Sequence, residues 1–106
     1  MKTPEPMKNM DTLVREQARL IILKALAAQV DEQLNSDLMI HELEPFGIRK
    51  DRAWVHDEFA WLAEHGAVAV TRAGSLMVAV LTQKGHRHLG REIAIEGVKR
   101  PSRPGD

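Results

Sequence analysis

Apolar residues recur at helical spacing over much of the first third of the chain. Between Asp11 or Thr12 and about Val30, one apolar face holds Val14, Ala18, Ile21, Ile22, Ala25 and Ala28. A second apolar line repeats every seven residues and consists of Leu13, Leu20 and Ala27, with Leu23 beside it. The pattern predicts one helix that is apolar on two faces.

Two arrangements would bury both faces of this helix. The rest of its own chain wraps it on both sides, or a second copy covers one of the faces. A seven-residue repeat is typical of paired helices. We therefore expect a homodimer whose interface holds Leu13, Leu20, Leu23 and Ala27.

Two further helices are predicted, with a tight turn between them. The first of them begins with Asn35 or Ser36 as its N-cap, and Pro45 and Gly47 end it. The next runs from about residue 50 to 65 and stops before a glycine. Two helices joined by a tight, glycine-containing turn form a helix-turn-helix arrangement.

A β-hairpin and a short last helix are predicted after the third helix. Val68 and Val70 alternate with smaller residues, and the loop 73–75 contains a glycine that permits a hairpin turn. The following strand, 76–82, is apolar on both faces, so we expect a partner subunit or the C-terminal segment to cover its outer face. Thr82 then caps the last helix, which reads QKGHRHLGREIA. The order is that of a winged helix, mainly α with a two-stranded wing.

One domain accounts for the 106 residues. We place it at residues 11–95, between a flexible arm at 1–10 and an extended basic tail at 96–106. No apolar run approaches the roughly 20 residues that span a bilayer, and the first ten residues do not read as a signal peptide. Because the chain has no Cys, disulfides and thiolate metal sites are excluded. We expect a cytoplasmic protein with no membrane partner.

The net charge is zero, but the charges are unevenly distributed. Residues 1–70 hold 8 Lys and Arg against 12 Asp and Glu, and residues 71–106 hold 7 against 3. The first part is therefore net −4 and the second net +4. A compact nucleic-acid binder usually shows a basic surface, and here the excess of cations lies in the C-terminal third.

The third predicted helix divides into two faces. Its apolar face holds Trp54, Val55, Phe59, Trp61 and Leu62. Glu58 falls within that face and is either a carboxylate at its rim or a partly buried partner for an Arg. In a winged helix the opposite face enters the major groove and the wing lies along the DNA backbone. The candidate DNA contacts are Arg49, Lys50, Arg52, Ala53, His56, Ala60, Arg72 and Lys84. Asp57 and Glu64 on the same face would repel phosphates.

Signals for a metal site or an enzyme are absent from the sequence. His86 and His88 would point to different faces of a helix, and the pair His41–Glu42 lacks the second His of a zinc-binding H-E-x-x-H motif. The chain has no Tyr, no phosphate-binding glycine loop and no G-x-S-x-G motif. We expect no enzyme, no metal and no cofactor.

Several short segments resemble winged-helix regulators of bacteria. Trp61–Val68 resembles the end of their recognition helix, and Leu81–Gly85 resembles their exit from the wing. The multidrug-response, PadR-type and ArsR-type regulators share these features. Leu34–Asn35 and Gly97–Pro101 add a closer resemblance, over residues 11–101, to small proteins of Mu-like phages and prophages labelled ArsR-type regulators.

This resemblance implies a DNA-binding transcription regulator of phage origin in a bacterial host. The chain departs from ArsR-type metal sensors in having no Cys. The alternative is a non-enzymatic winged-helix adaptor that makes protein contacts in phage DNA packaging or assembly. The recognition-helix layout and the basic C-terminal third favour double-stranded DNA as the partner, whereas the acidic remainder favours a phage protein.

Overall fold

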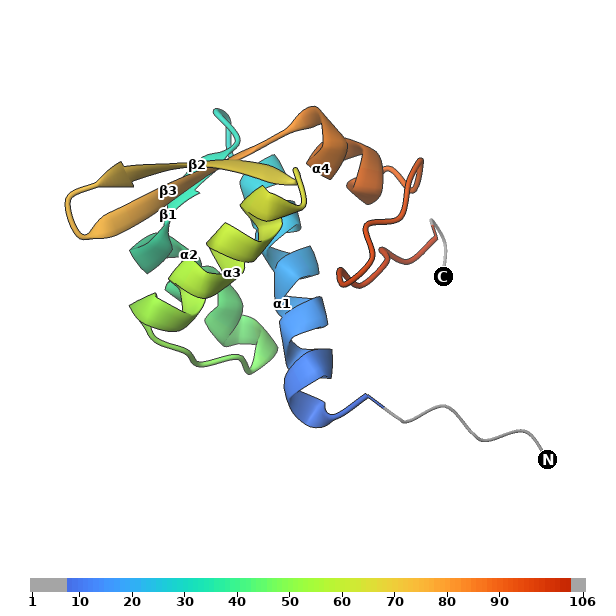
Figure 1. Cartoon of the computed structure of the whole chain (residues 1–106), viewed down its shortest axis with the longest axis horizontal. Helices are drawn as coiled ribbons and strands as arrows, with labels where there is room; N and C mark the ends of the chain where they lie inside the picture. Colours follow the sequence, from blue (N-terminus) through green and yellow to red (C-terminus); the bar gives the residue numbers. More distant parts are fainter. Residues whose placement is uncertain (1–7, 104–106) are drawn as a thin grey trace.

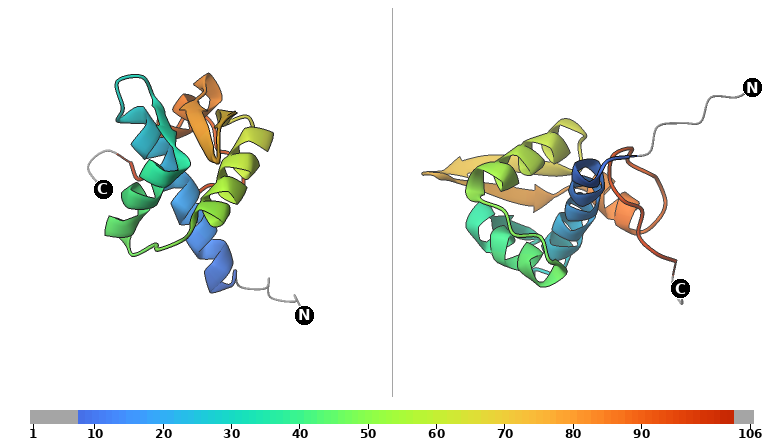
Figure 2. Two further views of the ribbon diagram at one scale, coloured as in Figure 1. Left: turned by 90° about the vertical axis from the view of Figure 1, so that its left-hand side faces the viewer. Right: turned by 90° about the horizontal axis from the view of Figure 1, so that it is seen from below.

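A computed structural model describes residues 8–103 of the chain (Figure 1). Its elements in chain order are α1 (Met10–Ala27), β1 (Gln33–Asn35), α2 (Ser36–Leu43), the 3-10 turn η1 (Glu44–Phe46), α3 (Arg52–Glu64), β2 (Val68–Ala73), β3 (Leu76–Leu81) and α4 (Gln83–Leu89). The three helices α1–α3 pack together, and the β2–β3 wing projects from them (Figures 1 and 2). The arrangement is a winged helix. No helix among the described residues is long and apolar enough to cross a membrane.

Polar side chains determine where each α-helix begins. Asn9, Asn35, Asp51 and Thr82 each accept a hydrogen bond from the backbone N–H three residues ahead, at 2.8–3.2 Å. The predicted N-caps Asn35 and Thr82 are confirmed. The first helix begins earlier than expected, because Asn9 caps it, and it ends at Ala27, before the predicted boundary near residue 30.

The sheet has three strands rather than the predicted two. Its order is β1–β3–β2, with both pairs antiparallel. The additional strand β1 pairs Leu34 with Ala79 and Asn35 with Val78. It arises because the chain turns back after α1, so that residues 33–35 satisfy the edge of β3 that the hairpin leaves open. The residues on the outer face of β3, Leu76, Val78 and Val80, remain half-buried.

The core lies between the helices and the inner face of the sheet. Its fully buried side chains come from all three large helices and include Ile22, Leu23, Leu26, Met39, Leu43, Val55, Phe59 and Leu62. Leu20 is only 6% exposed and Leu23 is fully buried in this core. They are therefore not free to form the dimer interface expected for them. The chain itself wraps this side of α1.

The C-terminal segment 90–103 lies on the Leu20 side of α1. It runs beside α1 after α4 (Figure 1), with Ile95 and Val98 each 5% exposed. The backbone N–H of Lys99 donates to the carbonyl of Glu16 on α1 at 3.1 Å. Residues 96–103, expected to be an extended tail, have no helix or strand but lie against the helical body. The last helix ends at Leu89 rather than continuing to Ala94.

Candidate nucleic-acid interface

The helix-turn-helix places α3 with one face inside the protein and one face outside. Val55, Phe59 and Leu62 are fully buried, as predicted, whereas Trp54 and Trp61 are only partly buried. The link from α2 turns at Gly47, whose φ of 79° is a left-handed conformation that glycine adopts without steric cost. This turn sets the angle between α2 and α3.

The outward face of α3 is small and acidic. Ala53, Asp57, Ala60 and Glu64 are all exposed, and their spacing puts them along one stripe of the helix. Ala53 and Ala60 thus lie where the sequence predicted groove contacts. The two carboxylates between and beside them would oppose phosphates along the C-terminal half of the helix.

Arg52 is already engaged within the protein. Its Nε and Nη2 atoms donate to the two carboxylate oxygens of Asp37 at 2.9 Å each. These hydrogen bonds hold the pKa of Asp37 below its ordinary value. A phosphate contact by Arg52 therefore requires exchange of one anion for another. The sequence reasoning missed Asp37, since a pairing partner on the preceding helix leaves no local signal.

His56 is half-buried where α3 meets the start of α2. Its Nε2 lies 2.9 Å from Ser36 Oγ, which also accepts the backbone N–H of Met77 at 3.2 Å. These contacts link α3 to the start of α2 and to β3. They give His56 a positioning role within the fold, and its predicted DNA contact stays a prediction. Burial lowers the pKa of His56, and the positive charges of Arg72 and Arg52 lower it further.

The wing meets α3 close to His56. Arg72 of β2 is paired with Met77 of β3, whose backbone N–H donates to the same Ser36 hydroxyl that lies against His56. Arg52 lies in the first turn of the same helix. Arg49 and Lys50 are exposed in the link that leads into α3. The Lys50 ammonium lies 5.5 Å from the ring centroid of Trp54. Four predicted cations thus lie at or near the N-terminal end of α3.

Lys84 does not join this group. It lies on α4 beside Gly66, where a Cβ built on the glycine would be 3.3 Å from its Cδ. Gly66 follows the C-terminal end of α3, and a 13-residue helix is about 20 Å long. Lys84 therefore lies at the opposite end of α3 from Arg49, Lys50 and Arg52.

Behind α3 lies a buried ion pair. Glu58 is 1% exposed, and Arg19 of α1 donates to it from Nε at 3.2 Å and from Nη2 at 3.3 Å. Arg15 adds a second guanidinium at 3.6 Å. Of the two interpretations of Glu58, the buried Arg partner is confirmed and the rim carboxylate is wrong. Burial raises the pKa of Glu58, and the two guanidinium groups oppose this shift.

Two of the predicted dimer contacts remain at the surface. Leu13 is 45% exposed, and Ala27 is exposed at the end of α1. With Leu20 and Leu23 in the core, these two residues do not form a continuous interface line, and the homodimer stays a prediction. Among the described residues, no group of three or more His, Asp or Glu side chains could hold a metal ion.

Comparisons with known proteins bear on the fold. No protein-family model matches the chain, and no curated protein matches it. A chain of a solved structure, described as the complex structure of hsRosR-S4, is similar to it with a TM-score of 0.59 and 16% sequence identity. The match covers 74% of this chain and 73% of the other. At this identity the likeness shows the fold alone. It does not support the phage origin, which stays a prediction.

Proposed function

We propose that this chain binds double-stranded DNA as a non-enzymatic winged-helix transcription regulator. The observation that carries the proposal is the link between the wing and α3. Arg72 of β2 is paired with Met77 of β3, and the backbone N–H of Met77 donates to the Ser36 hydroxyl, which lies 2.9 Å from His56 Nε2 on α3. A cation of the wing therefore lies near the N-terminal half of the helix that would enter the major groove. Arg49 and Lys50 extend the same positive surface along the link.

The contacts of this surface would be mostly to phosphates. Arg49, Lys50 and Arg72 are exposed, and long cationic side chains are the usual partners of the DNA backbone. Ala53, one residue into α3, is small enough to allow close approach and to contact a thymine methyl group. Asp57 and Glu64 keep the rest of α3 from lying deep in the groove, so we expect modest sequence specificity.

Salt dependence tests the phosphate contacts. Fluorescence anisotropy with a labelled duplex over a range of salt concentrations gives the slope of log K against log salt. Each phosphate contact contributes about 0.9 to that slope. Arg72→Ala should reduce the slope by about one contact for every duplex, whereas Arg87→Ala, at an exposed position on α4, should not. Equal slopes for both variants would contradict the proposed surface.

Removing a carboxylate from the same surface should increase DNA affinity, whereas removing a cation should decrease it. Asp57→Ala should strengthen binding to any duplex, because it removes a negative charge from the outward face of α3. Asp37→Ala should also strengthen it, since Arg52 would no longer be held by two hydrogen bonds. Glu92→Ala, an exposed carboxylate in the C-terminal segment, is the matched control. If all three variants bind alike, α3 does not face DNA.

The pKa of His56 offers an independent measure. In the free protein the charges of Arg72 and Arg52 help to lower it. A phosphate placed between these arginines would offset their charge, so the pKa should rise when DNA binds. An NMR titration of the imidazole resonances with and without duplex measures the change. No rise in the presence of saturating DNA would place the duplex elsewhere.

A second candidate function is that of an adaptor for a protein partner. The observation that favours it is the exposed acidic stripe of α3, together with the Arg52–Asp37 pair that neutralises the adjacent cation. An adaptor of this kind would accept a basic protein surface. It predicts no salt-dependent binding of DNA and no effect of Arg72→Ala on any duplex.

A further inference from the structure

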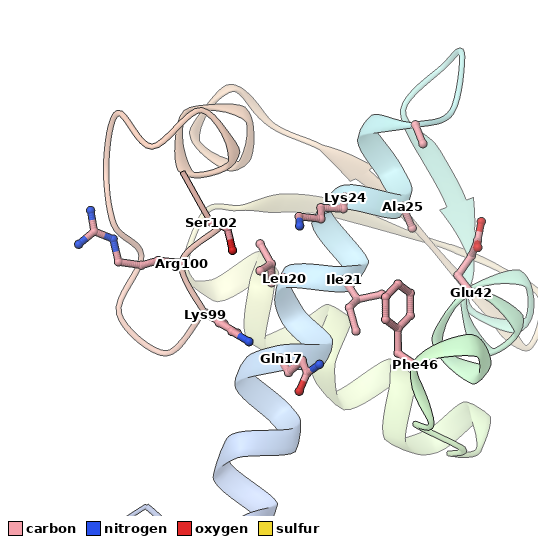
Figure 3. A pocket seen from close by; sticks show the side chains of 11 residues that line it. Gln17, Leu20, Ile21, Lys24, Ala25, Glu42, Phe46, Lys99, Arg100 and Ser102 are labelled. Atoms are coloured by element: carbon pink, nitrogen blue, oxygen red, sulfur yellow. The ribbon is translucent and has the colours of Figure 1, made fainter. Parts of the chain in front are cut away.

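A cavity of about 370 Å³ opens beside α1, and none of the predicted DNA contacts lines it (Figure 3). Leu20, Ile21 and Ala25 of α1 form its apolar floor. The ring of Phe46 from η1 stands at one side, next to Ile21 (Figure 3). Small-molecule sites are typically cavities of this size with an apolar lining and a few polar groups.

The other side of the cavity is polar and cationic. The ammonium groups of Lys24 and Lys99 and the hydroxyl of Ser102 lie around Leu20, whereas Arg100 points away (Figure 3). These groups come from two separate segments of the chain, α1 and the C-terminal segment. The cavity is therefore amphipathic, with an apolar half and a cationic half.

Hydrogen bonds hold the part of the C-terminal segment that lines the cavity, the cationic wall formed by residues 99–102. Arg19 donates to the carbonyl of Gly97 at 2.9 Å, and His88 Nε2 lies 3.0 Å from the carbonyl of Lys99. Arg91 donates to the carbonyl of Pro101. Three alternate carbonyls of the segment are thus hydrogen-bonded by side chains, two from α1 and α4 and one from the start of the segment itself. The backbone of this wall is therefore held before a ligand binds, which reduces the ordering free energy that binding would cost.

The charges around the cavity determine what it would accept. Within residues 8–103, neither Lys24 nor Lys99 has a carboxylate oxygen within 4.0 Å of its ammonium. One carboxylate, Glu42, lines the cavity, and it lies beyond Phe46 on the opposite side (Figure 3). An anionic group is therefore favoured at the lysine end and disfavoured at the Glu42 end.

We propose that this cavity binds a small amphipathic anion, a carboxylate attached to an apolar chain or ring. The carboxylate accepts hydrogen bonds from Lys24, Lys99 and Ser102. The apolar body of the ligand lies on Leu20 and Ile21 and against the Phe46 ring. It separates the ligand's carboxylate from Glu42 at the other end of the cavity. The proposal is independent of whether the chain binds DNA.

Two probes of matched length separate the charge from the apolar contact. Decanoate has the proposed chemistry, and decyltrimethylammonium has the same chain with the opposite charge. We expect decanoate to saturate and to shift the amide NMR signals of the cavity residues. Decyltrimethylammonium should bind at least about tenfold more weakly, since two lysines attract one probe and repel the other. Equal affinities for the two probes, or shifts spread over the whole surface, would overturn the proposal.

Substitutions at exposed lining positions test each half without threatening the core. Lys24→Gln and Lys99→Gln should each weaken decanoate about two- to fivefold and should not weaken the cationic probe. Lys84→Gln, outside the cavity, is the matched control. No loss of decanoate affinity in the double Lys24→Gln/Lys99→Gln variant would overturn the proposed anion site.

The apolar half has its own pair of variants. Phe46 is 58% exposed, and Phe46→Ala should weaken decanoate severalfold. Leu38 is 51% exposed outside the cavity, and Leu38→Ala should leave binding unchanged. Equal effects of these two variants would contradict the proposal. Shifts of the same cavity signals with protein concentration alone would show that a second copy covers the groove, and would also overturn it.

Discussion

Replacing Arg19 with Met should destabilise the domain more than any surface substitution. The Arg19 guanidinium makes contacts on three sides: it donates to Glu58, it donates to the carbonyl of Gly97, and it lies 3.8 Å from the ring centroid of Trp61. Met has a similar apolar stem but none of these interactions. The substitution leaves Glu58 buried, with Arg15 at 3.6 Å as its remaining guanidinium partner.

The expected cost follows from the charge left behind. Removing one partner of a buried ion pair costs about 3–5 kcal/mol, because the other charge stays in a poorly solvated site. Arg15 remains near Glu58 and compensates in part, so we expect a loss of about 3 kcal/mol in the free energy of unfolding. This is a large fraction of the roughly 5–15 kcal/mol that stabilises a typical domain. Urea denaturation followed by far-UV circular dichroism measures the loss.

Two further observations separate this explanation from simple loss of packing. In Arg19→Met/Glu58→Met no buried charge is left, so the double variant should be more stable than Arg19→Met alone.

The pH dependence of the free energy of unfolding should also change. A raised pKa in the folded state gives stability that is present at low pH and lost as the pH rises through that pKa. Burial raises the pKa of Glu58 and Arg19 opposes the rise.

Removing Arg19 should therefore raise the pKa of Glu58 further. Relative to the wild type, Arg19→Met should gain stability as the pH falls from neutral to about 5. A double variant as unstable as Arg19→Met, with no relative gain at lower pH, would refute the buried-charge reasoning.

Two other substitutions in the C-terminal segment and α4 test how the segment is held. Gly97→Ala should lower the free energy of unfolding by about 1–3 kcal/mol more than Gly74→Ala. Both glycines have positive φ, but a Cβ at position 97 would lie 2.5 Å from Cζ2 of Trp61, whereas a Cβ at position 74 would have no atom within 4 Å. Equal losses in thermal unfolding would show that the contact yields easily. His88→Phe should cost at least about 2 kcal/mol, because it removes two hydrogen bonds to buried backbone groups. His86→Phe, at an exposed site, is the control. Similar amide hydrogen-exchange rates across residues 95–101 in the two variants would contradict the role of His88.

Local signals in the sequence were sufficient to predict most helix boundaries. An N-cap acts on a backbone N–H three residues away, so Asn35 and Thr82 were recognisable from their immediate neighbours. The strand β1 was not, because Gln33–Asn35 is only three residues long and its stability comes from pairing with β3, far along the chain. Short strands of this kind have no periodicity to detect.

The dimer prediction illustrates a different limit. A seven-residue apolar repeat requires a covering surface, but it does not say whether that surface belongs to the same chain. Leu20 and Leu23 are covered by their own chain. The covering segment contains Pro and charged residues and has the composition of a disordered tail. Its order comes from backbone carbonyls at residues 97, 99 and 101, which accept hydrogen bonds from three side chains. Backbone acceptors leave no trace in a sequence.

Arg19 connects the two surfaces for which functions are proposed. Through Glu58 it holds the inner face of α3, and through the carbonyl of Gly97 it holds the wall of the amphipathic cavity. A substitution at Arg19 would therefore affect both surfaces together and would not distinguish them. Arg72 and Lys24 lie outside this network, since neither contacts Glu58 or residue 97 through a hydrogen bond or an ion pair among residues 8–103. Changes at these two exposed cations alter one surface at a time, so loss of DNA affinity with intact decanoate binding, or the reverse, assigns each function to its own side of the fold.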